Sequence, residues 1–485
     1  MKVVVALLLF SLTLVCVAAE SNHPPAGKNK LSAEDVLNSA ARHYPKILES
    51  IAEFRAAEAK TLSAEGAFDL TFDIDSYNYA EGFYDGRSVE ATASRYLNAR
   101  GGTRVYGGYK LSNGSFPVYE DERFTNTGGQ LNLGVLFSLL RDRDIDPRRF
   151  RVSDAGLAAQ QAKFDVLLTK LGIAQKAMVA YWRWVALGQK KQVYNNLLSI
   201  AEKRDVGLGK EVKEGARAEI VLTESRQNIT QRKSLLARAE RDFAVAANEL
   251  GMFYRDASGS PVFVGPENLP DYRPKPSPAD KNYELQNLNR LYASRPELQK
   301  LRNSITRAMR RIELNQNSLL PRLDLNLGVY QPLGSPAEGG LSRDDSDVIV
   351  GLQFSVPLER RVARGALAET RAKLNALRQK ERLMEDQIQL EVRNILLNLK
   401  TAEELLILAG DEVNQASVLQ RAEIQRFRKG ASDFFLVNIR ENTAAEAEVR
   451  FYLAGLQREI AQVNFDAATA NLEKLGISED ILNNY

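Results

Sequence analysis

The sequence predicts a mainly α-helical fold that combines long coiled-coil helical hairpins with a small number of β-strands. Two very long segments carry the seven-residue apolar repeat of wound helices, and four short segments alternate apolar and polar residues. The same order of elements occurs in both halves of the chain. Together these observations indicate an elongated molecule rather than a compact globular one.

The longest predicted helical hairpin spans residues 361–475. Its apolar residues alternate spacings of four and three, which is the pattern of helices wound around one another. They are Ile388, Val392, Ile395, Leu399, Ala402, Leu406, Ala409, Val413 and Ala416, then Val449, Leu453, Leu456, Ile460, Val463, Ala467 and Ala470. The first arm is about 100 Å long and the second about 65 Å. Helices of this length span a gap between membranes or form a scaffold.

A second, looser stripe lies beside the main seam of the first arm, at Leu390, Leu397, Leu405 and Leu408. A helix with two neighbours in a closed ring needs two such stripes, whereas a two-stranded coil needs one. The alternative is a single, wider core stripe.

Composition and the N-terminal residues limit which binding partners and which cellular compartment are expected. The 485 residues hold 65 Lys and Arg against 62 Asp and Glu, so the charge predicts no nucleic-acid partner. Residues 1–19 read as a signal peptide, with Lys2 before an apolar stretch and Val17-Ala18-Ala19 as the cleavage site. The stretch is short for a membrane anchor, and bulky Val15 disfavours lipid attachment at Cys16, the only cysteine. An exported chain without disulfides is stabilised by packing or assembly.

One unit is predicted to occur twice. Each repeat holds a helix interrupted by proline (Pro45 or Pro296), two strands and a helical hairpin, and the first helix begins at Ser32. The predicted parts are a first repeat at 20–254 with its hairpin at 153–250, a proline-rich connector at 255–281, a second repeat at 282–476 with its hairpin at 361–475, and a tail at 477–485.

The predicted strands lie near 67–79, 130–140, 322–330 and 348–357. Alternation with period two gives each an apolar face and a polar face. The polar positions expected to face a lumen are Asp69, Asp73, Asp75, Asp324 and Asn326. Residues 80–129, rich in Tyr, Gly and Asn, either extend the strands or form a surface loop.

These strands are close to the roughly 9–11 residues that cross a bilayer when tilted. In lipid no strand edge stays unpaired, and four strands do not close a barrel. The chain is therefore expected to pool strands with copies of itself, giving eight, twelve or sixteen around a polar lumen. The alternative is a half-buried sheet in a soluble protein, which is disfavoured because the helices are committed to coiled-coil seams.

Several motifs in this order resemble the TolC-type outer-membrane efflux family over nearly all of the mature chain. They are the doubled element order, Pro45 and Pro296, Leu319-Leu320-Pro321-Arg322-Leu323, Phe354-Ser355-Val356-Pro357, Ala180-Tyr181-Trp182 and Arg426-Phe427-Arg428-Lys429-Gly430. The resemblance implies a homotrimer whose four strands per chain form a 12-stranded barrel in the outer membrane of a Gram-negative bacterium. A twelve-helix tunnel would cross the periplasm, closed at its inner end until a periplasmic adaptor and an inner-membrane pump engage it.

Two departures from the family pattern are visible. The first repeat has Leu140 where the second has Pro357, so the change from strand to helix is built differently in the two halves. The best-studied member carries two aspartates after its hairpin glycine. The aligned positions in this chain lie near Leu436 and Ile439, neither of which is acidic. The resemblance therefore does not extend to an acidic ring at the entrance.

No constellation for catalysis is found in the sequence, so neither an enzyme nor a bound metal or cofactor is expected. The only histidines are His23 and His43, and no phosphate-binding glycine motif occurs, so energy for transport would come from a partner. Asp142, Asp144 and Asp146 are interpreted as the charged start of a helix rather than a calcium loop.

The hairpin ends hold the candidate site, whose charged groups are predicted to form ion pairs that keep the inner end closed. The candidates are Gly215, Glu219, Arg226, Lys429, Gly430, Asp433, Arg440 and Glu441. The alternative is a solvated turn in which Ser432 or Asp433 caps the returning helix.

The predicted function is a passive exit duct for efflux or type I secretion, and its cargo stays open. The alternative, from another class, is a periplasmic coiled-coil adaptor or scaffold without a pore. An adaptor would show one helical hairpin between small β-rich halves rather than a doubled unit with four strands.

Overall fold

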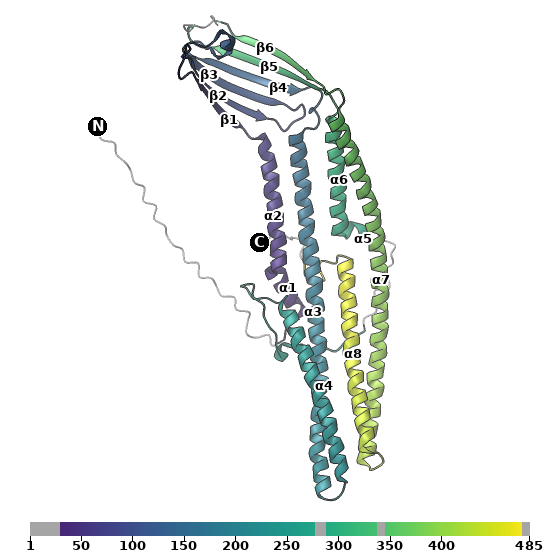
Figure 1. The fold of residues 1–485 in the computed structure, drawn as a ribbon. Coiled ribbons are helices and arrows are strands. Elements are labelled where there is room, and N and C mark those ends of the chain that lie inside the picture. Colours follow the sequence, from purple (N-terminus) through teal and green to yellow (C-terminus); the bar gives the residue numbers. More distant parts are fainter. Residues whose placement is uncertain (1–29, 277–287, 337–344, 478–485) are drawn as a thin grey trace, which may run out of the picture.

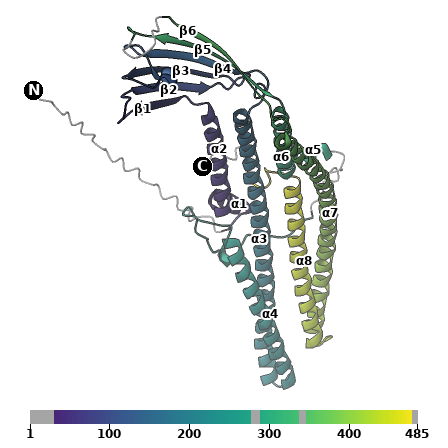
Figure 2. The ribbon, with the colours of Figure 1, turned by 45° about the horizontal axis from the view of Figure 1, so that its top comes forward.

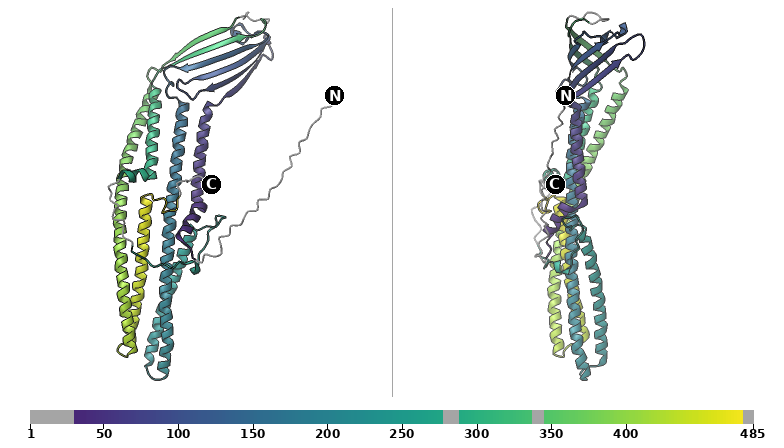
Figure 3. Two further views of the ribbon diagram at one scale, coloured as in Figure 1. Left: turned by 180° about the vertical axis from the view of Figure 1, so that it is seen from behind. Right: turned by 90° about the vertical axis from the view of Figure 1, so that its left-hand side faces the viewer.

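A computed structural model describes residues 30–276, 288–336 and 345–477 of the chain. The predicted signal peptide, parts of the connector and nearly all of the predicted tail lie outside these residues. A β-sheet occupies one end of the molecule, and the helices run lengthwise away from it (Figure 1). Views from behind and from the side show the same elongated shape (Figure 3).

The helices are α1 (Ala33–His43), α2 (Pro45–Glu65), α3 (Pro147–Lys213), α4 (Glu219–Gly251), α5 (Leu288–Ser294), α6 (Pro296–Asn317), α7 (Arg361–Arg428) and α8 (Phe434–Ala468). The strands are β1 (Thr71–Asn78), β2 (Arg87–Tyr96), β3 (Arg104–Asn113), β4 (Gln130–Ser138), β5 (Arg322–Pro332) and β6 (Asp347–Ser355). In the described part of the chain, none of the helices combines the length and hydropathy that a membrane crossing needs.

Local signals place most helix starts where the sequence predicts them. Ser32 caps α1 through a reciprocal pair of hydrogen bonds with Asp35, and Pro45 and Pro296 occupy the first positions of α2 and α6. The start of α3 is earlier than the predicted residue 153, because the side chain of Asp146 accepts hydrogen bonds from the amides of the first turn. Asp146 therefore acts as a helix cap.

The end of α8 corrects a prediction. The helix was expected to reach Leu475, but it ends at Ala468. Ala470 adopts a left-handed conformation with φ 50°, and the amide of Asn471 donates to the carbonyl of Asp466 (2.8 Å). This is the usual closure of a helix C-terminus, and an alanine fills the position that glycine normally takes.

The sheet also corrects a prediction, because it holds six strands rather than four per chain. Residues 80–129, for which strand and loop were both open, contain β2 and β3. All six strands are antiparallel to their neighbours and follow the order β1-β2-β3-β4-β5-β6, as the labels in Figure 2 show. The new strands escaped detection because Ala91, Ala93 and Gly107 leave their apolar alternation weak.

The pairing register puts like residues on like faces across the whole sheet. Asp73 lies opposite Thr92 and Asp75 opposite Glu90, while Phe72 and Ile74 lie opposite alanines. The same alternation continues through the other strands to β6. We call these two surfaces the polar face and the apolar face.

Burial on the two faces is the reverse of that in a water-soluble sheet. On the apolar face, Phe72, Ile74, Val350 and Leu352 are between 64% and 69% exposed. On the polar face, Ser88, Ser94 and Ser112 are only 5–8% exposed. An apolar surface of this extent is typical of an interaction site and not of a free surface in water.

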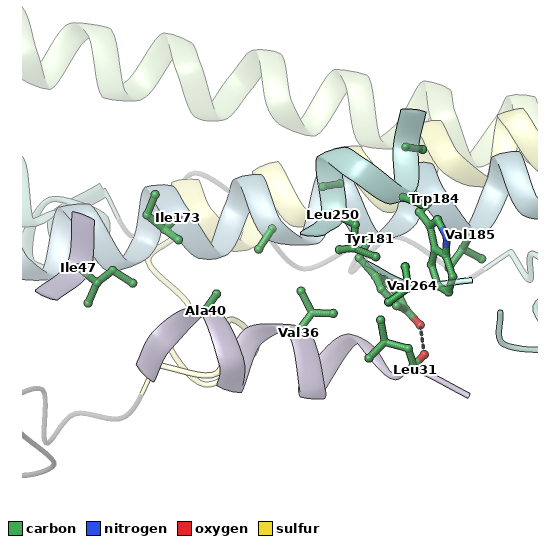
Figure 4. Packing of buried hydrophobic residues seen from close by; sticks show 14 of the residues in the cluster. Leu31, Val36, Ala40, Ile47, Ile173, Tyr181, Trp184, Val185, Leu250 and Val264 are labelled. Atoms are coloured by element: carbon green, nitrogen blue, oxygen red, sulfur yellow. Dashed lines mark hydrogen bonds between the residues drawn. The ribbon is translucent and has the colours of Figure 1, made fainter. Parts of the chain in front are cut away.

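The main helical core lies around the middle of α3. One cluster of buried side chains contains Trp184 and Val185 of α3, Val36 of α1, Ile47 of α2 and Leu250 of α4 (Figure 4). The hydroxyl of Tyr181 donates to the carbonyl of Leu31 (3.1 Å), which fixes the chain just before α1. This core fixes the upper helices and the first hairpin relative to one another.

The cap of α3 can be tested by Asp146→Ala. The substitution removes acceptors for the amides of Arg148 (2.7 Å) and Arg149 (3.0 Å), and we expect it to cost about 0.5–2 kcal/mol. Thermal unfolding in detergent, followed by circular dichroism, measures this as a lower midpoint. Asp144→Ala is the matched control, because the Asp144 side chain makes no hydrogen bond among the described residues. Equal midpoints for both variants would contradict the capping role.

Candidate functional site

Both hairpins turn at the end of the molecule farthest from the sheet (Figure 1). Gly215 and Gly430 adopt left-handed conformations with φ 76° and 73°, which other residues rarely take. In each turn the amide of the next residue reaches back five positions, from Ala216 to Glu211 (2.8 Å) and from Ala431 to Arg426 (2.9 Å). The two predicted hairpin glycines thus have the same local role.

Asp433 caps the returning helix of the second hairpin. Its side chain accepts a hydrogen bond from the amide of Leu436 (2.7 Å), and the neighbouring Ser432 hydroxyl donates to Glu423. The first hairpin has no matching side-chain cap, although Glu219 stands in the first turn of α4, where a carboxylate favours the positive helix end. Of the predicted roles for Asp433, capping is the one that the structure shows.

Glu441 is the centre of a buried ion-pair cluster that joins the two hairpins. Its carboxylate is 0% exposed and accepts hydrogen bonds from Arg204 of α3 (2.9 Å) and Arg232 of α4 (3.0 Å). Arg232 also donates to the carbonyl of Leu197 (2.8 Å). We call Arg204, Arg232 and Glu441 the buried triad, and its ion pairs connect α8 to both helices of the first hairpin.

The triad holds one carboxylate against two guanidinium groups. Burial lowers the pKa of Arg232, since an isolated charge is costly away from water, and the hydrogen bond that Arg232 donates to Glu441 opposes that shift. Removing the carboxylate would leave two cations close together with no counterion. Such a cluster is strongly destabilised by loss of a single member.

Sequence reasoning selected Glu441 but missed both arginines. A signal for Arg232 exists, because the buried positions Ser225, Arg232, Ala239 and Ala246 of α4 recur every seven residues. An arginine at such a seam position requires a buried counterion. The partner itself lies 209 residues further along the chain, beyond the reach of any local pattern.

The other predicted charges at the hairpin ends are not brought together. Within the described residues, Glu219, Arg226, Lys429 and Arg440 form no ion pair with one another or with other groups. A different contact links the two turns, since the guanidinium of Arg217 lies 4.9 Å from the ring centroid of Phe427. Closure of the inner end by ion pairs of these residues stays a prediction.

The predicted lumen residues share the polar face but differ in surroundings. Asp73 and Asp75 on β1 are exposed, and Asp69 lies just before this strand. Asp324 is buried and pairs with Arg322 (2.5 Å), whereas Asn326 accepts a hydrogen bond from the hydroxyl of Tyr106 (3.1 Å). No group of acidic, histidine or cysteine side chains suited to a metal ion occurs among the described residues.

The triad predicts a large effect for Glu441→Gln. The substitution keeps the shape of the side chain but leaves the buried guanidinium of Arg232 and the partly buried one of Arg204 without a counterion, and we expect a loss of about 3–5 kcal/mol of stability. Chemical denaturation of the detergent-solubilised protein measures it. Arg440→Gln, one residue away and without an ion pair, should change stability by about 0.5 kcal/mol or less. Similar losses in both variants would refute the triad.

Comparison with known proteins adds two findings. Residues 287–471 match the family model described as outer membrane efflux protein. In a comparison of sequences alone, no curated protein matches the chain.

The fold is similar to those of solved outer-membrane proteins. The outer-membrane channel OprN matches with a TM-score of 0.61 at 14% identity, covering 90% of this chain and 89% of its own. The Campylobacter jejuni CmeC outer membrane channel matches with 0.59 at 12% identity, covering 93% and 90%. The Vibrio cholerae outer membrane protein VceC matches with 0.60 at 14% identity, covering 90% and 95%.

The predicted resemblance is confirmed by the family model and by the similar folds of the solved structures. The chain matches the outer membrane efflux protein model over residues 287–471 and shares, over about nine-tenths of its length, the fold of the outer-membrane channels OprN and CmeC.

Proposed function

We propose that the protein is the outer-membrane exit duct of a tripartite efflux pump or a type I secretion system. It acts as a passive homotrimer in the outer membrane of a Gram-negative bacterium, with most of its helices in the periplasm. The observation that carries this proposal is the sheet, whose apolar face is exposed and whose edge strands β1 and β6 lack a second neighbour within the described part of the chain. Lipid covers such a face, and copies of the chain cover such edges.

The helices support assembly with copies of the chain. The main seam of α7 is buried against α8, as Val392, Leu399 and Leu406 show. The second stripe, at Leu390, Leu397, Leu405 and Leu408, is 54–63% exposed in the single chain. These leucines face away from α8, and a neighbouring copy in a ring of helices buries them.

Partners bind at the two ends of the duct in this proposal. Outer-membrane lipid surrounds the sheet, and a periplasmic adaptor with an inner-membrane pump engages the hairpin turns at Gly215 and Gly430. The pump supplies the energy, because the chain offers no nucleotide-binding motif and no catalytic constellation. A coiled-coil adaptor or scaffold is less well supported, since a sheet with its apolar face outward has no role in water.

Assembly can be tested by Leu397→Glu on the exposed stripe. A carboxylate buried in an interface between helices loses its hydration, which is unfavourable. We therefore expect loss of the detergent-resistant trimer from outer-membrane fractions. Crosslinking and size-exclusion chromatography measure the change. Lys400→Glu, which exchanges one exposed charged side chain for another on the same helix, is the control and should leave the trimer intact. A wild-type chain that fractionates as a soluble periplasmic monomer would refute the duct and support the scaffold.

Closure of the inner end can be tested by conductance in planar bilayers. If charged groups at the hairpin ends hold the duct closed, replacing both Arg440 and Glu441 with alanine should raise single-channel conductance severalfold. The single variants separate the two contributions, because only Glu441 belongs to the buried triad. Unchanged conductance in the double variant would reject closure by these charged groups, although the proposal of an exit duct would stand.

A further inference from the structure

We propose that β2 and β3 are two additional membrane-crossing strands, so that three copies of the chain close an eighteen-stranded barrel rather than a twelve-stranded one. The inference rests on the trimeric duct proposed above and goes beyond it, because it sets the width of the outlet. It arises from the six-stranded sheet of this chain, in which all strands form one continuous ladder.

The two strands are full members of the sheet. Every residue of β2, from Arg87 to Tyr96, lies opposite a residue of β3, and β1 pairs with β2 along its whole length from Thr71 to Asn78. β3 in turn pairs with β4 from Arg104 to Lys110. A hairpin that merely projected from the membrane would not separate β1 from β4 in this way.

The turn between β2 and β3 is fixed to the helical end of the sheet. The amide of Gly101 donates to the carbonyl of Arg143 (2.8 Å), and the carbonyl of Gly101 accepts a hydrogen bond from the amide of Ser138 (2.9 Å). At Gly102 a Cβ atom would come within 2.7 Å of the Asp142 carbonyl oxygen, so the backbones are closely packed. The turn is therefore built into the junction between β4 and α3.

A side-chain contact reinforces this junction. The guanidinium of Arg148, in the first turn of α3, lies 3.6 Å from the ring centroid of Tyr96 at the end of β2. Arg95 also donates to the carbonyl of Phe68, just before β1 (2.9 Å). These contacts hold β2 in line with the strands that lead into helices.

The faces of β2 and β3 continue those of their neighbours. Val89, Ala91 and Ala93 share the apolar face with Phe72 and Ile74 of β1. On the polar face, Glu90 of β2 pairs with Lys110 of β3 (3.4 Å) and accepts a hydrogen bond from Asn132 of β4 (3.2 Å). This polar contact across three strands is suited to the wall of a water-filled lumen.

The added strands widen the barrel without adding helices. At the helical end of the sheet, β1, β4, β5 and β6 each connect to a helix, whereas β2 and β3 are joined to each other by a turn. Because barrel diameter grows roughly linearly with strand number, the outlet is about 1.5 times as wide as a twelve-stranded one. The outlet therefore does not limit cargo size, and the narrowest part lies among the helices.

Closure follows from strand direction. Six strands are too few for a closed barrel with a lumen, since about eight already fill theirs with side chains. In an antiparallel ladder of six, the two edge strands β1 and β6 run in opposite directions. β6 of one copy therefore pairs antiparallel with β1 of the next copy.

Site-directed spin labelling tests the proposal in lipid vesicles. Single cysteines replace Ala91, Thr92 and Ala93 on β2, with Leu325, Asn326 and Leu327 on β5 as the matched set. We expect labels at 91 and 93 to be more accessible to oxygen, which partitions into lipid, and the label at 92 to a water-soluble nickel chelate. The set on β5 should alternate in the same way.

The matched set separates the two proposals. If β5 alternates while all three labels on β2 respond to the chelate, β2 lies outside the membrane and the eighteen-stranded barrel is wrong, although the duct stands. If neither strand alternates, the duct itself is wrong. Labels at Tyr109, Lys110 and Leu111 of β3 give a second reading should a variant on β2 fail to assemble, with only position 110 expected to face water.

Discussion

The structure depends on a sheet that is unfinished in a single copy. Its apolar side chains are exposed, while Ser88, Ser94, Ser112 and Asp324 are buried on the opposite face. Among the described residues, each edge strand has a pairing strand on one side alone. Water would hydrate the edges but not the apolar face, whereas lipid would cover the face but not the edges. The proposed closed ring of copies within a bilayer satisfies both requirements.

The helices also leave apolar surface that a copy of the chain would cover. The need for assembly therefore extends from the sheet along the helices. α7 has one buried seam and one exposed leucine stripe, so a single chain leaves the stripe without a packing partner among the described residues. Within one copy, the buried triad ties α8 to α3 and α4 and makes the two hairpins one unit. Opening at the hairpin ends thus requires either whole copies to move or this buried ion-pair cluster to break.

Sequence patterns predicted the elements whose causes are local. Ser32, Pro45, Pro296 and the acidic residues before Pro147 each act on the adjacent turn, and the structure confirms their positions. β2 and β3 were left undecided because Ala91 and Gly107 give little hydrophobic contrast. The end of α8 was misplaced because Ala470 takes a conformation usually reserved for glycine. Arg204 lies 237 residues from Glu441, and the local sequence around either residue does not identify the other as its partner.

Amide hydrogen exchange in the membrane-reconstituted protein tests the central claim most directly. The account predicts that β1 and β6, which are edges in one chain, become interior strands in the assembly. Their amides at residues 71–78 and 347–355 should then be protected as strongly as those of β4. Exchange of either segment as fast as that of the turn at 80–86 would show open edges and contradict the account.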